Sequence, residues 1–137
     1  MKIEVRYFTK SGNTEKLATA VASAAGVGAL PVSEGLTGHA DILFLGSSVY
    51  AGKPAAEISE FIRKNASNIG RIVVFGSSAS GKSSFGKIKE LAGSVGIEVE
   101  PEYFHCPGHF LWMHRNRPDA GDLNEITGFA KKMIAAD

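Results

Sequence analysis

Three hydroxyl side chains and a glycine lie close together near the start of the chain, in Thr9, Lys10, Ser11, Gly12, Asn13 and Thr14. The segment follows a β-rich run, residues 3–8, and precedes a stretch rich in helix formers. Free backbone N–H groups and the helix dipole at such a helix start favour a phosphate dianion, and glycine lets the backbone approach it closely. Judged by spacing alone, the segment could equally be a hydroxyl-rich helix N-cap that binds no ligand.

A second candidate segment follows an unbroken apolar run at residues 42–45. We expect a loop over residues 46–53, which contains small residues with free amides and one aromatic ring: Ser47, Ser48, Val49, Tyr50, Ala51 and Gly52. Such a loop can pack against a flat heterocycle. The alternative interpretation is an ordinary turn with a surface tyrosine.

A third segment, residues 76–83, matches the nucleotide-binding P-loop pattern, with Lys82 and Ser83 where that pattern binds phosphate and magnesium. It follows an apolar run and opens a helical pattern. After Ser83, however, the chain offers no apolar strand that ends in aspartate to complete a metal site. A P-loop nucleotide-binding protein is therefore the secondary hypothesis.

The only cysteine lies in an aromatic and basic segment, residues 103–117. His105, Cys106, His109 and His114 suggest zinc ligands, but their spacing fits no standard zinc finger, and we expect no metal site. Aromatic residues alternate with basic ones here, as on a nucleic-acid surface. The segment is short and the chain is not basic overall, so we expect no nucleic-acid binding. A docking surface or a flap near a ligand is the functional alternative to a packed loop.

The elements that position these segments are predicted strands and helices that alternate along the chain. Strand patterns occur at residues 3–8, 29–32, 42–45, 72–75 and 97–99, and the last is expected at a sheet edge because Pro101 follows it. Helical patterns occupy residues 14–25, a stretch that begins at Pro54, residues 85–95, and a final stretch that opens with Asp122 and Glu125 in capping-box spacing.

This alternation predicts an α/β fold with a doubly wound, five-stranded parallel sheet in the order 2-1-3-4-5 and helices on both faces. In such sheets ligands bind beyond the carboxyl ends of the strands where the strand order reverses, which brings residues 9–14 and 47–52 together. Glu4 and Arg6 alternate with apolar residues in the first strand, although that strand is central. They point to the same face, where we expect them to pair.

Composition indicates the broad class of protein. The chain has 137 residues, of which 44% are hydrophobic and 21% charged, as in one soluble globular domain, residues 1–137. Its net charge of +1 excludes electrostatic binding to nucleic acid or membranes as a default function. One cysteine, no signal-peptide core and no apolar run of about 20 residues together favour a cytoplasmic location.

Thr9, Ser11, Gly12, Asn13 and Thr14, within residues 7–18, resemble the phosphate-binding signature of the flavodoxins. Residues 46–54 are similar to the second flavin loop of short flavodoxin-like proteins, and residues 76–81 fall where the third loop is expected. Residues 106–110, then 118–123 and a final helix, also resemble the C-terminal region of these proteins. The resemblance covers nearly the whole chain.

The resemblance implies non-covalent FMN, with the phosphate on residues 9–14 and the ring between residues 47–52 and the third loop, Ser77, Ser78, Ala79, Ser80 and Gly81. Tyr50 would stack on the ring or edge it. It further implies electron transfer or flavin-dependent reduction, an unknown redox partner protein, no residue with its own catalytic role, and a monomer or weak dimer. The chain departs from the family in its net charge, because flavodoxins are strongly acidic, and in a third loop that lacks aromatic and acidic residues. A flavin-free interaction domain with this fold is the remaining alternative.

Overall fold

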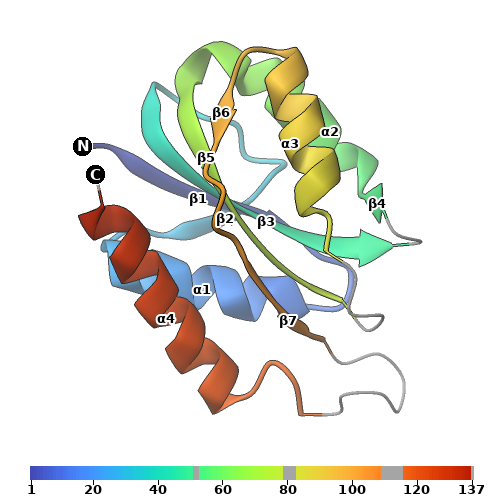
Figure 1. The fold of residues 1–137 in the computed structure, drawn as a ribbon, viewed down its shortest axis with the longest axis vertical. Coiled ribbons are helices and arrows are strands. Elements are labelled where there is room, and N and C mark those ends of the chain that lie inside the picture. The colour runs from blue at the N-terminus through green and yellow to red at the C-terminus, as the bar shows by residue number, and fades with distance from the viewer. Residues whose placement is uncertain (51–52, 79–82, 109–115, 137) are drawn as a thin grey trace.

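In the computed structural model, which describes residues 1–50, 53–78, 83–108 and 116–136, the strands form one sheet with helices on both sides (Figure 1). The elements in chain order are β1 (Ile3–Phe8), α1 (Asn13–Ala25), β2 (Ala29–Pro31), β3 (Ala40–Tyr50), β4 (Lys53–Pro54), α2 (Ala56–Asn65), η1 (Ala66–Asn68), β5 (Ile69–Ser78), α3 (Phe85–Ser94), β6 (Glu98–Val99), β7 (Phe104–Pro107) and α4 (Ala120–Ala135).

The sheet follows the order β2-β1-β3-β5-β6, which confirms the predicted order 2-1-3-4-5. Two short strands share the fifth position, because β6 pairs with β5 near Arg71 and β7 pairs with β5 over residues 75–78. Pro101, which has no N–H to donate to a ladder, lies in the interruption between them. The sequence pattern predicted the first of these strands and missed the second.

The strands at the centre of the sheet extend further than the sequence suggested. Residues 46–53 were expected to form a loop, but β3 continues to Tyr50 and pairs with the short antiparallel strand β4. Pro54 belongs to β4, so the expectation that it opens a helix is wrong, and α2 begins at Ala56. The extension forms because β3 has a parallel partner on each side, β1 and β5, up to Ser47 and Ser48 respectively.

Alternate side chains of the central strands supply the two halves of the core. Val5, Phe44 and Phe75 face α1 and α4, while Leu45 and Val74 face α2 and α3. Figure 1 shows these two helix pairs on opposite sides of the sheet. This burial on both faces explains the continuous apolar runs in the sequence.

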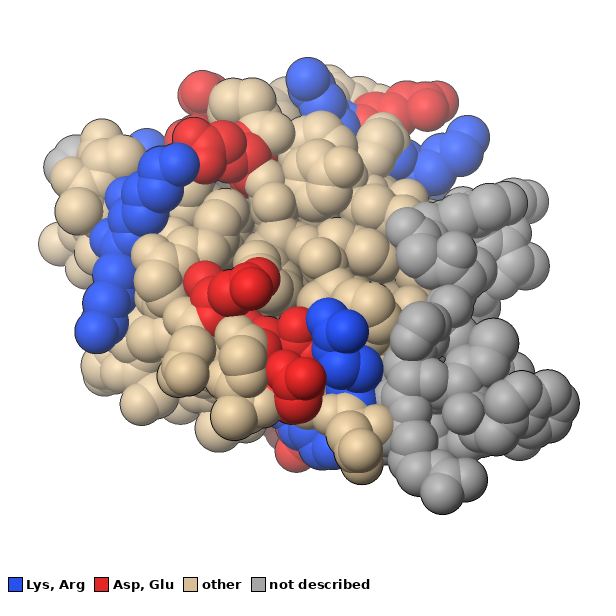
Figure 2. Space-filling model, turned by 60° about the horizontal axis from the view of Figure 1, so that its bottom comes forward, with Lys and Arg blue, Asp and Glu red and all other residues tan. Residues whose placement is uncertain are grey.

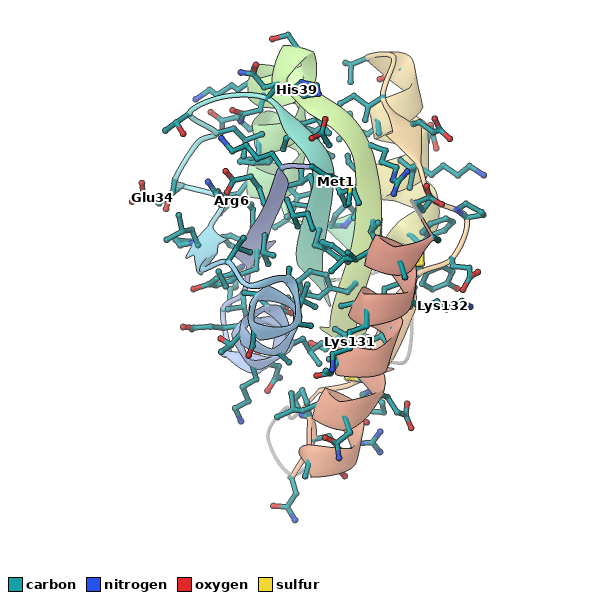
Figure 3. All side chains as sticks on the ribbon, turned by 90° about the vertical axis from the view of Figure 1, so that its left-hand side faces the viewer. Met1, Arg6, Glu34, His39, Lys131 and Lys132 are labelled. Atoms are coloured by element: carbon teal, nitrogen blue, oxygen red, sulfur yellow. The ribbon has the colours of Figure 1, made fainter. Side chains whose placement is uncertain are left out.

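The charged pair in β1 packs beneath the connection from β2 to β3. Arg6 is only 3% exposed, and its guanidinium donates to the Glu4 carboxylate at 3.1 Å, as the alternation in β1 predicted. It also donates to the backbone oxygens of Glu34 and Gly35, and Figure 3 shows Arg6 beside the segment that carries Glu34. A buried arginine thus replaces apolar contacts where this crossover has no helix.

Helix α4 begins earlier than predicted. Its capping box joins Asp119 and Asp122, each carboxylate accepting from the other residue's backbone N–H at 2.9 Å, so the predicted box of Asp122 and Glu125 is wrong. Arg117 donates twice to the Asp122 carboxylate, and this bonding holds the pKa of Asp122 below its usual value. The ion pair fixes the chain as it enters the helix.

Candidate functional site

Three buried hydroxyls meet at the carboxyl end of the sheet. Thr14, in the first turn of α1, is fully buried, and its Oγ1 lies 2.6 Å from Ser48 Oγ on β3 and 3.2 Å from Ser77 Oγ on β5. Each of the three candidate segments contributes one member. The hydroxyl cluster, Thr14, Ser48 and Ser77, therefore joins segments that the sequence could only place at the same end of the sheet.

The start of α1 leaves room for an anion. Gly12 is the N-cap residue, so no side chain caps the first turn, and its φ of 88° is one that glycine adopts without strain. The Gly12 N–H donates to Thr9 Oγ1 at 3.0 Å, which folds the segment back on itself. The acidic residue of this first turn, Glu15, hydrogen-bonds Tyr7, and together with burial, the larger cause, it raises the pKa of Tyr7.

Two glycines allow the strands beneath the hydroxyl cluster to approach. A Cβ on Gly46 would lie 2.5 Å from the Phe75 ring and 2.9 Å from the Thr14 methyl group. A Cβ on Gly76 would overlap the carbonyl oxygen of Ser47 on the neighbouring strand. Both glycines are therefore required by packing within the sheet, and a ligand is not needed to explain them.

The end of β7 borders the site next to β5. Ser78, the last residue of β5, lies with its Oγ 3.0 Å from His105 Nε2, and its backbone oxygen accepts from the Gly108 N–H at 3.1 Å. Gly108 also lies against Asn13, because a Cβ there would be 2.9 Å from Asn13 Nδ2. The sequence predicted no role for His105 other than the zinc alternative. No spacing pattern revealed its contact with Ser78, which depends on the unpredicted strand β7.

The structure places most of the predicted site residues at this end of the sheet. Thr9, Lys10, Ser11 and Gly12 form the β1–α1 connection, Asn13 and Thr14 begin α1, Ser47, Ser48, Val49 and Tyr50 end β3, and Ser77 and Ser78 end β5. Ala51, Gly52, Ala79, Ser80 and Gly81 lie outside the described residues. The predicted segments therefore lie together, although their serines belong to strands where loops were expected.

The P-loop-like pattern begins inside a strand. Gly76, Ser77 and Ser78 belong to β5, where Ser78 pairs with Pro107 of β7. Residues 79–82, including Lys82, lie outside the described residues. Because the first three positions are held by strand pairing, they are not available as an open loop around phosphates.

The residues of the zinc alternative separate across β7. Cys106 packs in the core beneath α4, whereas its neighbour His105 points to the opposite face toward Ser78. Burial is the main cause that raises the pKa of the Cys106 thiol to about 12. His109 and His114 lie outside the described residues, and within the described ranges no group of three or more His, Cys, Asp and Glu side chains is placed to hold a metal ion.

A cavity of about 560 Å³ borders the β1–α1 connection on the α2 side of the sheet. Phe8 and Phe61 contribute apolar surface to it, Glu60 and Lys64 contribute charge, and Thr9 belongs to its wall. No member of the hydroxyl cluster lines it. The candidate site is therefore the meeting point of the strand ends rather than this neighbouring cavity.

Comparisons with known proteins give relatives by structure alone. No protein-family model matches the chain, and no curated protein matches it. A flavodoxin from the domain Archaea superposes with a TM-score of 0.81 at 21% identity, covering 99% of this chain and 98% of that one. Oxidised Flavodoxin 2 from Bacillus cereus gives a TM-score of 0.72 at 21% identity, with both chains covered completely.

A third solved structure contains a bound flavin. A flavoprotein in complex with FMN from Lactobacillus acidophilus gives a TM-score of 0.62 at 17% identity, covering 77% of this chain and 92% of that one. These comparisons establish that the chain has the flavodoxin-like fold.

Among the helices of the described residues, none combines the length and the hydrophobicity required to cross a membrane.

Proposed function

We propose that this chain, with its flavodoxin-like fold, binds FMN non-covalently and acts in electron transfer or in the reduction of a small substrate. One observation carries the proposal: the hydroxyl cluster joins the uncapped start of α1 to the ends of β3 and β5, at the place where this fold reverses its strand order. Solved structures of the same fold are described as flavodoxins, one flavoprotein among them in complex with FMN.

The residues present fit the phosphate of FMN. Gly12 has open space around its Cα, with no heavy atom within 4 Å of a built Cβ, so the backbone of the connection can approach an anion closely. The α1 dipole and first-turn amides favour a dianion there, and Thr9 and Ser11 supply hydroxyls beside them. Glu15, bonded to Tyr7, is engaged away from this position.

The site favours FMN over FAD. Residues 9–14 form one phosphate cradle, and the chain lacks the Gly-x-Gly-x-x-Gly turn that binds a diphosphate. The flavin ring would lie beside residues 47–52 and the end of β5, as the family resemblance implies.

Bound FMN supplies one-electron and two-electron chemistry, and the chain's own residues position the cofactor and select its partner. No titratable side chain belongs to the hydroxyl cluster, so the cluster orients without exchanging protons at neutral pH. The partner differs from that of an acidic flavodoxin, because the net charge is +1. On the face that Figure 2 shows, acidic and basic side chains lie side by side.

The test is reconstitution followed by spectroscopy and calorimetry. We expect the purified protein to bind FMN with two visible bands, to bind FAD much more weakly and to bind no Mg-ATP. Ser11→Ala should weaken FMN about tenfold or more, since a hydrogen bond to a charged group contributes roughly 1.5–3 kcal/mol. Ser23→Ala, at the exposed far end of α1, is the matched control. Riboflavin, which lacks the phosphate, should bind both variants equally.

Lys82→Ala separates FMN binding from the P-loop hypothesis. If the chain binds FMN as proposed, this variant keeps FMN affinity within a few-fold, because residues 9–14 hold the phosphate. A P-loop lysine contacts phosphate directly, so its loss would abolish nucleotide binding. Micromolar Mg-ATP binding that disappears in Lys82→Ala, with no FMN binding by either protein, would refute the proposed function. A colourless protein that binds neither ligand would instead support a flavin-free interaction domain.

A further inference from the structure

The last residues of β7 connect two segments of the candidate site. His105 meets the side chain of Ser78, and Gly108 donates to the backbone of the same residue. Gly108 also packs against Asn13 and Ser77, with a built Cβ 2.9 Å from Asn13 Nδ2 and 3.2 Å from Ser77 Oγ. Ser78 is thus held at two points by one strand end, and it is itself one of the residues assigned to the third flavin loop.

We call the contact of His105 and Gly108 with Ser78 the junction between β7 and β5. His105 is its titratable member. Its ring is partly buried, and burial lowers its pKa from the usual 6.5, which means that the fold favours the neutral ring. A neutral imidazole bonds the Ser78 hydroxyl in either tautomer, as donor or as acceptor. A protonated ring can still donate to the Ser78 hydroxyl, but it can no longer accept, and it must carry its charge in a partly desolvated place. Acid therefore favours displacement of the ring toward water, where its charge is hydrated, and this displacement breaks the bond to Ser78.

No charged group of the described residues contributes to the pKa shift of His105, whose only cause is burial. β5 faces His105 with Gly76 and Ser78, neither of which titrates. On the other face of β7, α4 and its approach carry Asp119, Asp122, Glu125 and Arg117, which act on the Cys106 thiol. For His105 itself, burial is the cause of the shift. Protonation of this ring is therefore opposed rather than stabilised locally.

We propose that His105 is a positioning residue for the flavin: its neutral ring fixes Ser78 at the end of β5, and protonation releases that end and weakens FMN binding. The inference rests on the proposed function. The hydrogen bond of His105 is to Ser78, which is not a member of the hydroxyl cluster, so its effect passes through Ser78. Acid thus acts on one edge of the site while the hydroxyl cluster stays in place.

The experiment measures FMN affinity by fluorescence quenching from about pH 5 to about pH 8, on both sides of the usual histidine pKa. The variants are His105→Gln, whose amide can bond Ser78 without titrating, and Ser78→Ala. His39→Gln is the matched control, because His39 is an exposed histidine paired with Asp41 and outside this junction. Dividing each affinity by that of His105→Gln at the same pH removes the titration of the FMN phosphate itself.

We expect the ratio for the wild type to fall about three- to tenfold between neutral and acidic pH, as one lost hydrogen bond allows. Its midpoint should lie below 6.5, the usual histidine value. His39→Gln should follow the wild type, and Ser78→Ala should bind more weakly at neutral pH with a flat ratio. A pH-independent wild-type ratio, or wild-type behaviour in Ser78→Ala, would overturn the inference.

Nuclear magnetic resonance of the flavin-free protein tests the junction independently. We expect the His105 ring to titrate below 6.5 and to shift the amide signals of residues 76–78 as it does so. If these signals stay unchanged, His105 does not position the end of β5, whatever the flavin result. If they move but no variant binds FMN, the proposed function fails while the proton-sensitive junction stands.

Discussion

Replacement of Thr14 by valine tests the hydroxyl cluster most directly. Valine keeps the shape of threonine and its methyl contact near Gly46, but it removes the Oγ1 that lies 2.6 Å from Ser48 Oγ and 3.2 Å from Ser77 Oγ. All three side chains are buried, so the two serine hydroxyls cannot replace the lost partner with bulk water without local opening. The variant should therefore destabilise the protein even without a ligand.

The magnitude follows from two buried hydrogen bonds. Each neutral bond contributes about 0.5–1.5 kcal/mol net, so Thr14→Val should lower the free energy of unfolding by about 1–3 kcal/mol. For a domain of this size about 1 kcal/mol corresponds to roughly 3–5 °C, so a loss of about 2 kcal/mol lowers Tm by about 6–10 °C. Thermal and urea unfolding of the flavin-free protein, followed by circular dichroism, measure both values.

Two controls isolate the hydroxyl. Thr14→Ser keeps the hydroxyl and loses only the methyl group beside Gly46, so it should retain most of the stability. Thr19→Val removes an exposed hydroxyl from the same helix, one that donates to the Glu15 backbone oxygen, and should change the free energy of unfolding by about 0.5 kcal/mol or less. Equal stability of Thr14→Val and Thr19→Val would refute a structural role for the cluster.

Three further predictions concern the parts that support the site. Gly76→Ala should cost more than about 3 kcal/mol in urea unfolding, because its Cβ overlaps the Ser47 carbonyl oxygen and backbone must move. Asp122→Asn should cost about 2 kcal/mol at neutral pH, because a neutral amide weakens the two bonds from Arg117 and the bond from the Asp119 N–H. The Asp122 pKa is lowered from 3.8, so this difference should hold above that value and vanish as the pH falls through the lower folded pKa. Cys106, with a thiol pKa of about 12, should react with iodoacetamide at mildly alkaline pH far more slowly in the folded protein than in urea.

The sequence predicted the parts of the fold that depend on hydrophobic periodicity. β1 occupies residues 3–8 as expected, α1 begins one residue earlier than expected, and the order of the sheet follows from alternating strands and helices. The short apolar runs at residues 42–45 and 72–75 indicate strands covered on both faces, and both runs are buried in central strands. The paired Glu4 and Arg6 were also predictable, because alternation places them on the same face.

What the sequence did not predict depends on contacts between segments. Gly46, Ser47 and Ser48 have low strand propensity and were assigned to a loop, yet pairing with β1 and β5 holds them in β3. Strand β7 was missed because it has only four residues, too few for alternation of apolar and polar side chains to indicate a strand. Since His105 reaches Ser78 only through that strand, its position could not be derived from residue types or spacing.

The small residues at the ends of β3 and β5 connect the fold to the candidate site. Larger side chains at Gly46 and Gly76 would separate the central strands from each other and from α1 at the level where the hydroxyl cluster forms. Because β3 and β5 stay paired as far as Ser48 and Ser77, both serines lie within hydrogen-bond distance of Thr14. The geometry of the site is therefore set by the sheet. We expect mutations of these glycines to reduce FMN affinity and stability together, whereas Ser11→Ala should reduce affinity alone.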